Sequence, residues 1–260
     1  MSHTFTRAIV RPPSATFTQG ITSHSALGAP DLALAAQQHA AYCEALVNCG
    51  LTLSTLPPDD AYPDSTFVED TAVIARGCAV LTRPGAASRA GEIVSMKRSL
   101  AEFFPSLHEI VAPGTVDGGD ICEAEDEVFI GISERTNAEG ARQLTALLAT
   151  VGIPARTIDI RKIPGLLHLK SGLTSLGNTA LVAAPEIAER PEFAGYKVVP
   201  IIPGEEYAAN CVRVNDRVLI ATGFPYLLAN LQWMGFDPIE LDMWEFEKMD
   251  GGLSCLSLRF

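Results

Sequence analysis

Short apolar runs, separated by polar or glycine-containing breaks, recur along the chain and predict pairs of β-strands. Turn-forming residues at several of the breaks favour hairpins. The expected pairs lie at residues 67–83 with a turn at Arg76-Gly77, 121–132 with a break at 124–126, 166–184 with a break at Gly177-Asn178, and 211–222 with a turn at Asn215-Asp216.

A helix and a single strand are expected between several of these pairs, so the pattern recurs roughly every 45–50 residues. The helices are expected at about 89–104, 138–151 and 225–234, and the single strands at 155–160, 197–202 and 238–241. Two further strands, at about 7–11 and 253–260, lack a hairpin partner. Pairing these two would close a ring and protect both edges. We therefore predict an α/β fold, a five-bladed αβ propeller of pseudo-repeated ββαβ units, with four full units and one split across the termini.

Composition adds limits on size, partners and compartment. No linker divides the 260 residues, so one domain over 1–260 is expected. The formal net charge of −12 argues against nucleic acid or an anionic membrane as a partner and is compatible with a cationic ligand. No apolar run approaches the ~20 residues of a membrane helix, and no secretion signal is evident, which favours the cytoplasm. The six cysteines show neither a Cys-x-x-Cys pair nor a zinc spacing, so free thiols, no metal and no cofactor are expected.

Cys255 follows the flexible Gly251-Gly252 pair in a strand-like run. A lone cysteine is more often a buried core thiol than a nucleophile, and catalysis would require a base and an orienting acid elsewhere. His168 shares one face of its expected strand with Lys170. A lone histidine among leucines is usually a core residue, but its reference pKa near neutrality also suits a general acid or base.

Acidic residues gather in two other segments. Asp117 and Asp120 flank Gly118-Gly119, and two glycines in this position indicate a tight turn with close backbone approach, although a surface turn is the common alternative. Glu69 and Asp70 are adjacent in an expected strand, so their side chains should point to opposite faces. At least one of them should face inward, where a carboxylate needs a cation or a donor.

Arg89 and Arg135 lie near expected junctions between a strand and a helix, where loops often carry binding residues. Each alone is more often a capping or surface residue, but the planar guanidinium can hold both oxygens of a carboxylate. Together, one cysteine, one histidine, several carboxylates and two arginines fit a ligand with a carboxylate at one end and a guanidinium at the other.

Ordered sequence blocks cover almost the whole chain, at residues 63–70, 82–85 with Arg89, 114–120, 135–137, 167–171, 208–211 and 250–255. In these blocks the chain resembles the dimethylarginine dimethylaminohydrolase family, within the guanidine-modifying superfamily of the pentein fold. The resemblance implies hydrolysis of asymmetric dimethylarginine and monomethylarginine to citrulline and dimethylamine or methylamine, through a covalent cysteine thiouronium intermediate. It implies that Cys255 is the nucleophile, His168 the general acid and base, and Asp117 the residue that orients His168.

The resemblance also implies a binding role for several other residues. The guanidinium would be held by Asp70 and Glu69, the α-amino group by Asp64 and the backbone near Ile21, and the α-carboxylate by Arg89 and Arg135, with Phe67 also in the substrate site. Residues 17–28 would form a lid. Some members of the family have Glu where this chain has Asp117, which leaves open whether the contact with His168 is direct. Homodimers are common in the family, but no apolar stripe in the sequence identifies an interface.

Other functions within and outside the superfamily remain open from the sequence. A deiminase or ureido hydrolase acting on arginine, agmatine or citrulline is the nearest alternative, and two arginines placed for an α-carboxylate argue against agmatine. A non-catalytic arginine-binding module is the alternative from another class, and the presence of both Cys255 and His168 argues against it. A metal-binding protein has no ligand spacing in its support.

Overall fold

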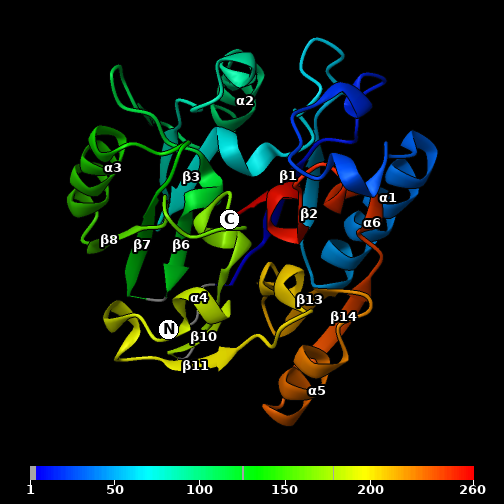
Figure 1. Ribbon diagram of the computed structural model, residues 1–260. Coiled ribbons are helices and arrows are strands. Elements are labelled where there is room, and N and C mark those ends of the chain that lie inside the picture. Colours follow the sequence, from blue (N-terminus) through cyan, green and yellow to red (C-terminus); the bar gives the residue numbers. More distant parts are fainter. Residues whose placement is uncertain (1–3, 125, 178) are drawn as a thin grey trace.

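The computed structural model describes residues 4–124, 126–177 and 179–260. Five three-stranded sheets are arranged around a central axis (Figure 1). Each sheet contains one antiparallel and one parallel strand pair. The sheets that are continuous in sequence comprise β3 (Ala72–Ala75), β4 (Cys78–Leu81) and β5 (Leu107–Glu109); β6 (Ile121–Ala124), β7 (Glu127–Ile132) and β8 (Ala155–Asp159); β9 (Leu173–Gly177), β10 (Ala180–Ala183) and β11 (Lys197–Pro200); and β12 (Val212–Val214), β13 (Arg217–Ala221) and β14 (Asp237–Leu241).

The fifth sheet is shared between the two ends of the chain. Its central strand β1 (Arg7–Val10) pairs with β2 (Thr52–Thr55) on one side and with β15 (Ser257–Arg259) on the other. The backbone N–H of Arg7 donates to Phe260 O at 2.8 Å, and that of Phe260 donates back to Arg7 O at 2.9 Å. The predicted ring of five units, one of them split across the termini, is therefore confirmed.

Helices connect the parallel strands of each unit and lie on the outer rim of the ring (Figure 1). They are α1 (Leu32–Asn48), α2 (Ile93–Leu100), α3 (Ala138–Thr150), α4 (Pro185–Ala188) and α5 (Pro225–Trp233), and α6 (Trp244–Glu247) follows β14. Apolar residues are buried between sheet and helix, as where Val80 and Ile130 pack with Leu144 of α3. Each such fully buried side chain stabilises the fold by about 1.5–3 kcal/mol. The three predicted helices correspond to α2, α3 and α5.

The hairpins turn where the sequence predicts them. Arg76, with φ at 47°, and Asn215, with φ at 56°, adopt the left-handed conformation that a tight two-residue turn requires. The Asn215 side chain also donates to Phe5 O at 3.1 Å and to Cys49 O at 2.9 Å, which ties its hairpin to the neighbouring unit. Two other predicted breaks include Glu125 and Asn178, which lie outside the described residues.

A short 3₁₀ turn precedes the first strand of every unit. These turns are η3 (Val68–Thr71), η5 (Gly118–Asp120), η6 (Leu169–Ser171), η8 (Glu206–Ala209) and η9 (Leu253–Leu256). The prediction of strand at η3, η6 and η9 is wrong, because polar groups turn the chain back on itself there. In η3, for example, the Thr71 hydroxyl donates to Val68 O at 2.7 Å. His168 and Lys170 consequently share a turn and not the face of a strand.

Candidate active site

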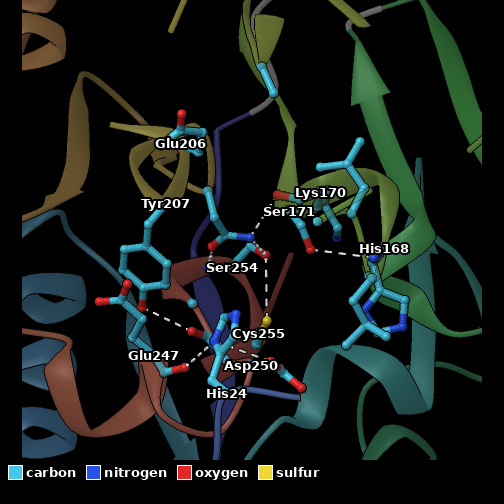
Figure 2. A pocket seen from close by; sticks show the side chains of 18 of the residues that line it. His24, His168, Lys170, Ser171, Glu206, Tyr207, Glu247, Asp250, Ser254 and Cys255 are labelled. Carbon is cyan, nitrogen blue, oxygen red and sulfur yellow. Dashed lines mark hydrogen bonds and ion pairs between the residues drawn. The ribbon is translucent and has the colours of Figure 1, made fainter. Parts of the chain in front are cut away.

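The five 3₁₀ turns meet at one end of the axis, around a cavity of about 540 Å³ (Figure 2). η3 packs against η5 and η9, and η6 packs against η5 and η8. Because equivalent segments of a ring lie at the same end of its axis, residues far apart in sequence converge here. The wall includes Glu69, Gly119, His168, Lys170, Tyr207, Asn210, Ser254 and Cys255.

Cys255 lies half-buried in η9 at the wall of this cavity. Burial raises the pKa of its thiol to about 12, and the negative charges of Glu69 and Asp70 act in the same direction. The thiol is therefore protonated at neutral pH. Since only the thiolate is a strong nucleophile, a cation bound beside the sulfur would be needed to favour it.

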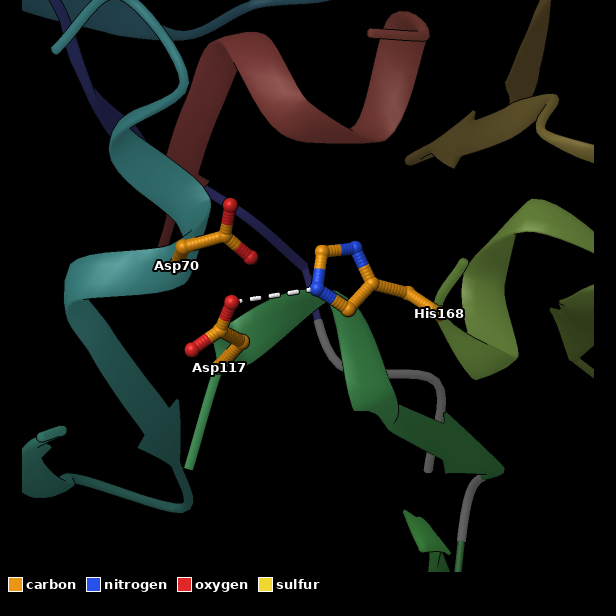
Figure 3. Close-up of side chains that lie close together, drawn as sticks. All are labelled: Asp70, Asp117 and His168. Atoms are coloured by element: carbon orange, nitrogen blue, oxygen red, sulfur yellow. Dashed lines mark hydrogen bonds and ion pairs between the residues drawn. The ribbon is translucent and has the colours of Figure 1, made fainter. Parts of the chain in front are cut away.

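His168 lines the same cavity and contacts Asp117 behind it (Figure 3). Its Nε2 lies 3.1 Å from Asp117 Oδ2, so the contact is direct despite the short aspartate side chain. The other oxygen, Asp117 Oδ1, accepts the Gly85 N–H at 2.7 Å, which fixes the carboxylate. Burial favours the neutral imidazole, but three nearby carboxylates, led by Asp70, outweigh it and raise the pKa of His168 to about 9. The imidazolium can therefore donate a proton at neutral pH.

Gly118 and Gly119 allow η5 to lie against both η3 and the imidazole. A side-chain carbon on Gly118 would lie 1.9 Å from Glu69 O, and one on Gly119 would lie 2.7 Å from His168 Nδ1. Neither position has room for a larger residue. The close backbone approach that the sequence predicts for this pair is confirmed.

Asp70, buried directly behind Gly119, accepts the Gly119 N–H at 2.8 Å and the guanidinium of Arg89 at 2.5 Å. Burial opposes ionisation, but the charges of Arg89 and His168, together with the hydrogen bonds from Arg89 and Gly119, outweigh it and lower the pKa of Asp70 to about 2. Arg89 is itself buried and also donates to Glu92, and to the backbone oxygens of Asp64 and Phe67. In this state the guanidinium of Arg89 is thus committed to internal partners and lies behind the cavity.

Glu69 is held by groups that the sequence analysis did not single out as functional. Its Oε1 lies 2.5 Å from Lys170 Nζ, and its Oε2 accepts the Ser254 hydroxyl at 2.8 Å. Asn210 in turn donates to Lys170 O at 2.8 Å and to Ser254 Oγ at 3.0 Å, and accepts the Ser254 N–H at 2.9 Å. Lys170, Asn210 and Ser254 all lie within the sequence blocks described above, which is the signal that could have identified them.

Asp64, Ile21 and Phe67, which are predicted to contact the amino-acid end of a substrate, are not among the residues that line the cavity. Asp64 Oδ1 accepts the Ile21 N–H at 3.0 Å. Burial raises the pKa of Asp64, and the nearby cations Arg89 and Arg135 oppose the rise. The centroid of the Phe67 ring lies 6.2 Å from that of Phe17, the first residue of the predicted lid.

A further buried carboxylate, Asp120, supports the turn that carries His168. Its Oδ1 accepts the Leu169 N–H at 2.9 Å, and its Oδ2 accepts the Ser133 hydroxyl at 2.6 Å. Burial raises the pKa of Asp120 to about 6, against the effect of the His168 charge. Asp120 therefore links η5 to η6 next to the imidazole.

The predicted lid, residues 17–28, reaches over the cavity and is fastened to the segment before Cys255. The Ser23 N–H and hydroxyl donate to Asp250 at 2.6 and 2.7 Å, and the Thr22 hydroxyl donates to Lys248 O at 2.7 Å. Ser23 and His24 form part of the cavity wall. Lid and nucleophile are thus connected through the short segment 250–255.

Asp70, Asp117 and His168 place one potential metal-ligating atom each within 4.8 Å of one another (Figure 3). Their proximity is explained by hydrogen bonds, because Asp70 is engaged by Arg89 and Asp117 by Gly85 and His168. The three side chains are therefore held together by hydrogen bonds to each other and to Arg89 and Gly85.

No helix in the described part of the chain is long and apolar enough to cross a membrane.

No family model matches the sequence. The chain is 44% identical over 257 residues to the N(G),N(G)-dimethylarginine dimethylaminohydrolase of Pseudomonas aeruginosa, covering 98% of this chain and all of that one. A structure of the Pseudomonas aeruginosa enzyme, a cysteine-to-serine mutant complexed with citrulline, superimposes with a TM-score of 0.96 at 43% identity, over 99% of this chain and 100% of that one. A histidine-to-glycine variant of a dimethylarginine dimethylaminohydrolase, as an adduct with S-methyl-L-thiocitrulline, gives a TM-score of 0.95 at 44% identity, over 98% and 100% of the two chains.

Proposed function

This chain belongs to the dimethylarginine dimethylaminohydrolase family, and on that premise we propose that it hydrolyses asymmetric dimethylarginine and monomethylarginine to citrulline and dimethylamine or methylamine. It is a hydrolase of guanidino C–N bonds with the pentein fold. The observation that supports the activity most is the convergence of Cys255 and the His168–Asp117 pair on one cavity, beside the carboxylates of Glu69 and Asp70.

The first step forms the covalent intermediate. Binding of the guanidinium cation beside Cys255 lowers the pKa of the thiol, and the sulfur attacks the guanidinium carbon. The C–N bond to the methylated nitrogen then breaks, and His168 delivers the proton that this nitrogen needs to leave as a neutral amine. The result is an S-alkylthiouronium cation on Cys255 and a neutral His168, and the proton that the thiol lost on substrate binding has gone to solvent.

The second step consumes one water. His168 takes a proton from the water as it attacks the thiouronium carbon, and the C–S bond breaks. Citrulline is released, the Cys255 thiol is restored with one proton of the water, and the other proton stays on His168, which is again an imidazolium. Asp117, fixed by the Gly85 N–H, holds the imidazole in place and stabilises its charged form in both steps.

Substrate recognition is proposed for the residues around this centre. Asp70 and Glu69 hold the guanidinium nitrogens, Asp64 and the backbone of Ile21 hold the α-amino group, Arg89 and Arg135 hold the α-carboxylate, and Phe67 packs beside the substrate. Because Arg89 contacts Asp70 at rest, substrate binding would exchange one cation on Asp70 for another and free Arg89 for the carboxylate.

We also propose a compartment, a domain organisation and an oligomeric state for the protein. The six cysteines of the chain are all free thiols, in accord with a reducing compartment such as the cytoplasm. Residues 1–260 would act as a single catalytic domain without metal or cofactor, and a homodimer would be detected by sedimentation.

A substrate panel tests the activity. Purified protein is incubated with asymmetric dimethylarginine, monomethylarginine, arginine, agmatine and citrulline, and citrulline and the released amine are measured. We expect turnover of the two methylated arginines and weak or no turnover of the others. Ammonia from arginine as the dominant product would instead identify a deiminase.

The nucleophile is tested in the same assay. Cys255→Ser should abolish turnover while the variant still binds methylated arginine in calorimetry, because a hydroxyl is a far weaker nucleophile here than a thiolate. Cys43→Ser, which changes another half-buried thiol, is the matched control. A Cys255→Ser variant with the wild-type rate would remove Cys255 from the mechanism.

A further inference from the structure

A second cavity of about 500 Å³, the axial cavity, lies at the opposite end of the propeller axis. Its mouth is surrounded by the hairpin ends of the units, and its wall by their first strands. The residues at the mouth are Phe5, Arg76, Asp126, Gly177 and Asn215, and those of the wall include Cys122, Glu123, Thr174, Ser175, Val212, Arg213 and Arg259. The 3₁₀ turns of the active site lie at the other ends of the same strands.

Two residues, Lys170 and Ser254, line both cavities. Between them lies Glu69, which accepts the Ser254 hydroxyl and pairs with Lys170 Nζ. Arg259 Nη2 reaches the same carboxylate from the second cavity at 3.8 Å. The partition between the two cavities is thus a thin layer of polar side chains beside Cys255.

The second cavity is built to hold water. Glu123 projects into it from β6 and is exposed, and within the described residues it has no hydrogen-bond or ion-pair partner. The surrounding protein raises the pKa of Glu123 to about 7, against the effect of the Lys170 and Arg259 charges, and the exposed carboxyl group is open to water in the cavity. Polar cavities of this size are occupied by water, whereas dry cavities are apolar.

The proposed reaction needs water at a moment when the front of the site is obstructed. After the amine leaves, the amino-acid portion of the substrate is still attached to Cys255 and extends toward the lid. Ser23 of the lid is fastened to Asp250, and this contact would have to open for water to enter from that side. The thin polar partition lies on the opposite side.

We propose that the axial cavity supplies the hydrolytic water to the thiouronium on Cys255, through the partition formed by Glu69, Lys170 and Ser254. This rests on the proposed function. The water forms the new C–O bond, the C–S bond breaks, and the released proton leaves through His168. Blocking or drying the axial cavity therefore slows the second step and leaves the first unchanged.

The test separates the two steps in time. Enzyme is mixed with asymmetric dimethylarginine and quenched in acid at successive times, and the covalent adduct on Cys255 is measured by mass spectrometry of the intact protein. Ser175→Phe places a ring in the cavity, and Glu123→Leu removes its charge at similar volume. Glu44→Phe adds the same ring at an exposed position of α1 that lines neither cavity, and is the matched control.

We expect adduct decay to slow about tenfold or more in Ser175→Phe and Glu123→Leu, with adduct formation changed less than about twofold, and no effect in Glu44→Phe. Circular dichroism and thermal unfolding establish that each variant is folded, and Glu123→Leu decides alone if Ser175→Phe does not fold. Unchanged decay in a folded variant, or equal slowing of formation and decay, overturns the axial water route. Absence of citrulline formation from asymmetric dimethylarginine by the wild-type protein would instead refute the proposed function.

Discussion

The contact between Asp117 and His168 gives a prediction that can be worked through quantitatively. Asp117→Asn keeps the shape of the side chain, and its amide oxygen can still accept the Gly85 N–H. The amide nitrogen then faces His168 Nε2 and donates to it, which favours the neutral imidazole in place of the imidazolium. The substitution should therefore lower the pKa of His168.

The size of the effect follows from the structure. The pKa of His168 is raised from 6.5 to about 9, and Asp117 is the carboxylate that hydrogen-bonds to it at 3.1 Å. Loss of a charge at this distance lowers a pKa by about 1 to 3, or roughly 1.4–4 kcal/mol of coupling. Because the folded-state pKa is raised, the stabilisation is complete below pH 6.5 and is lost as the pH rises through about 9. The wild-type protein should thus lose roughly 3 kcal/mol of stability over this range, and Asp117→Asn should lose less.

Two measurements check this reasoning. Titration of the imidazole by NMR gives the pKa of His168, and urea unfolding at pH 6 and pH 9.5 gives the difference in stability. Asp126→Asn, which removes an exposed carboxylate, is the control and should change neither value. A pKa of His168 in Asp117→Asn equal to that of the wild-type protein would refute the electrostatic role given to Asp117.

Two further predictions concern close packing and buried charge. Gly119→Ala places a carbon 2.7 Å from His168 Nδ1 and should lower kcat about 100-fold by displacing the ring, whereas Gly195→Ala, with no atom within 4 Å of the new carbon, should retain wild-type kcat. Equal rates for the two variants would contradict the proposed position of the imidazole in catalysis. Arg89→Met leaves buried carboxylates without their cation and should lower the free energy of unfolding by about 3–5 kcal/mol in urea, while Arg142→Met, at an exposed ion pair, should leave the unfolding midpoint unchanged. Similar midpoints for Arg89→Met and the wild-type protein would show that the buried charges rearrange without cost.

The ring could be predicted because its signals are local. The residue types of the Arg76-Gly77 and Asn215-Asp216 turns predict hairpins without further information. The alternation of these hairpins with helices then indicates the repeat. The absence of hairpin partners for the first and last strands indicated closure, and β1 and β15 do pair.

The 3₁₀ turns of the active site could not be predicted in the same way. Leu169 and Leu253 sit in apolar runs that resemble strands, and their turns are stabilised from distant parts of the chain. The Leu169 N–H donates to the Asp120 carboxylate. The turn that contains Leu253 is held where the Ser254 N–H donates to the side chain of Asn210, which lies 44 residues earlier in the chain. The sequence likewise predicts that an acid near Asp70 needs a cation, but only the fold shows that Arg89 already provides one.

Closure of the ring has a consequence for how the protein matures on the ribosome. Cys255 is followed almost at once by β15, the strand that pairs with β1, so the nucleophile and the fastening of the ring emerge after every other unit has been synthesised. Until then β1 lacks one of its neighbours, and the cavity lacks its sulfur. A nascent chain that has not yet reached Cys255 therefore lacks both the proposed nucleophile and the strand that closes the ring.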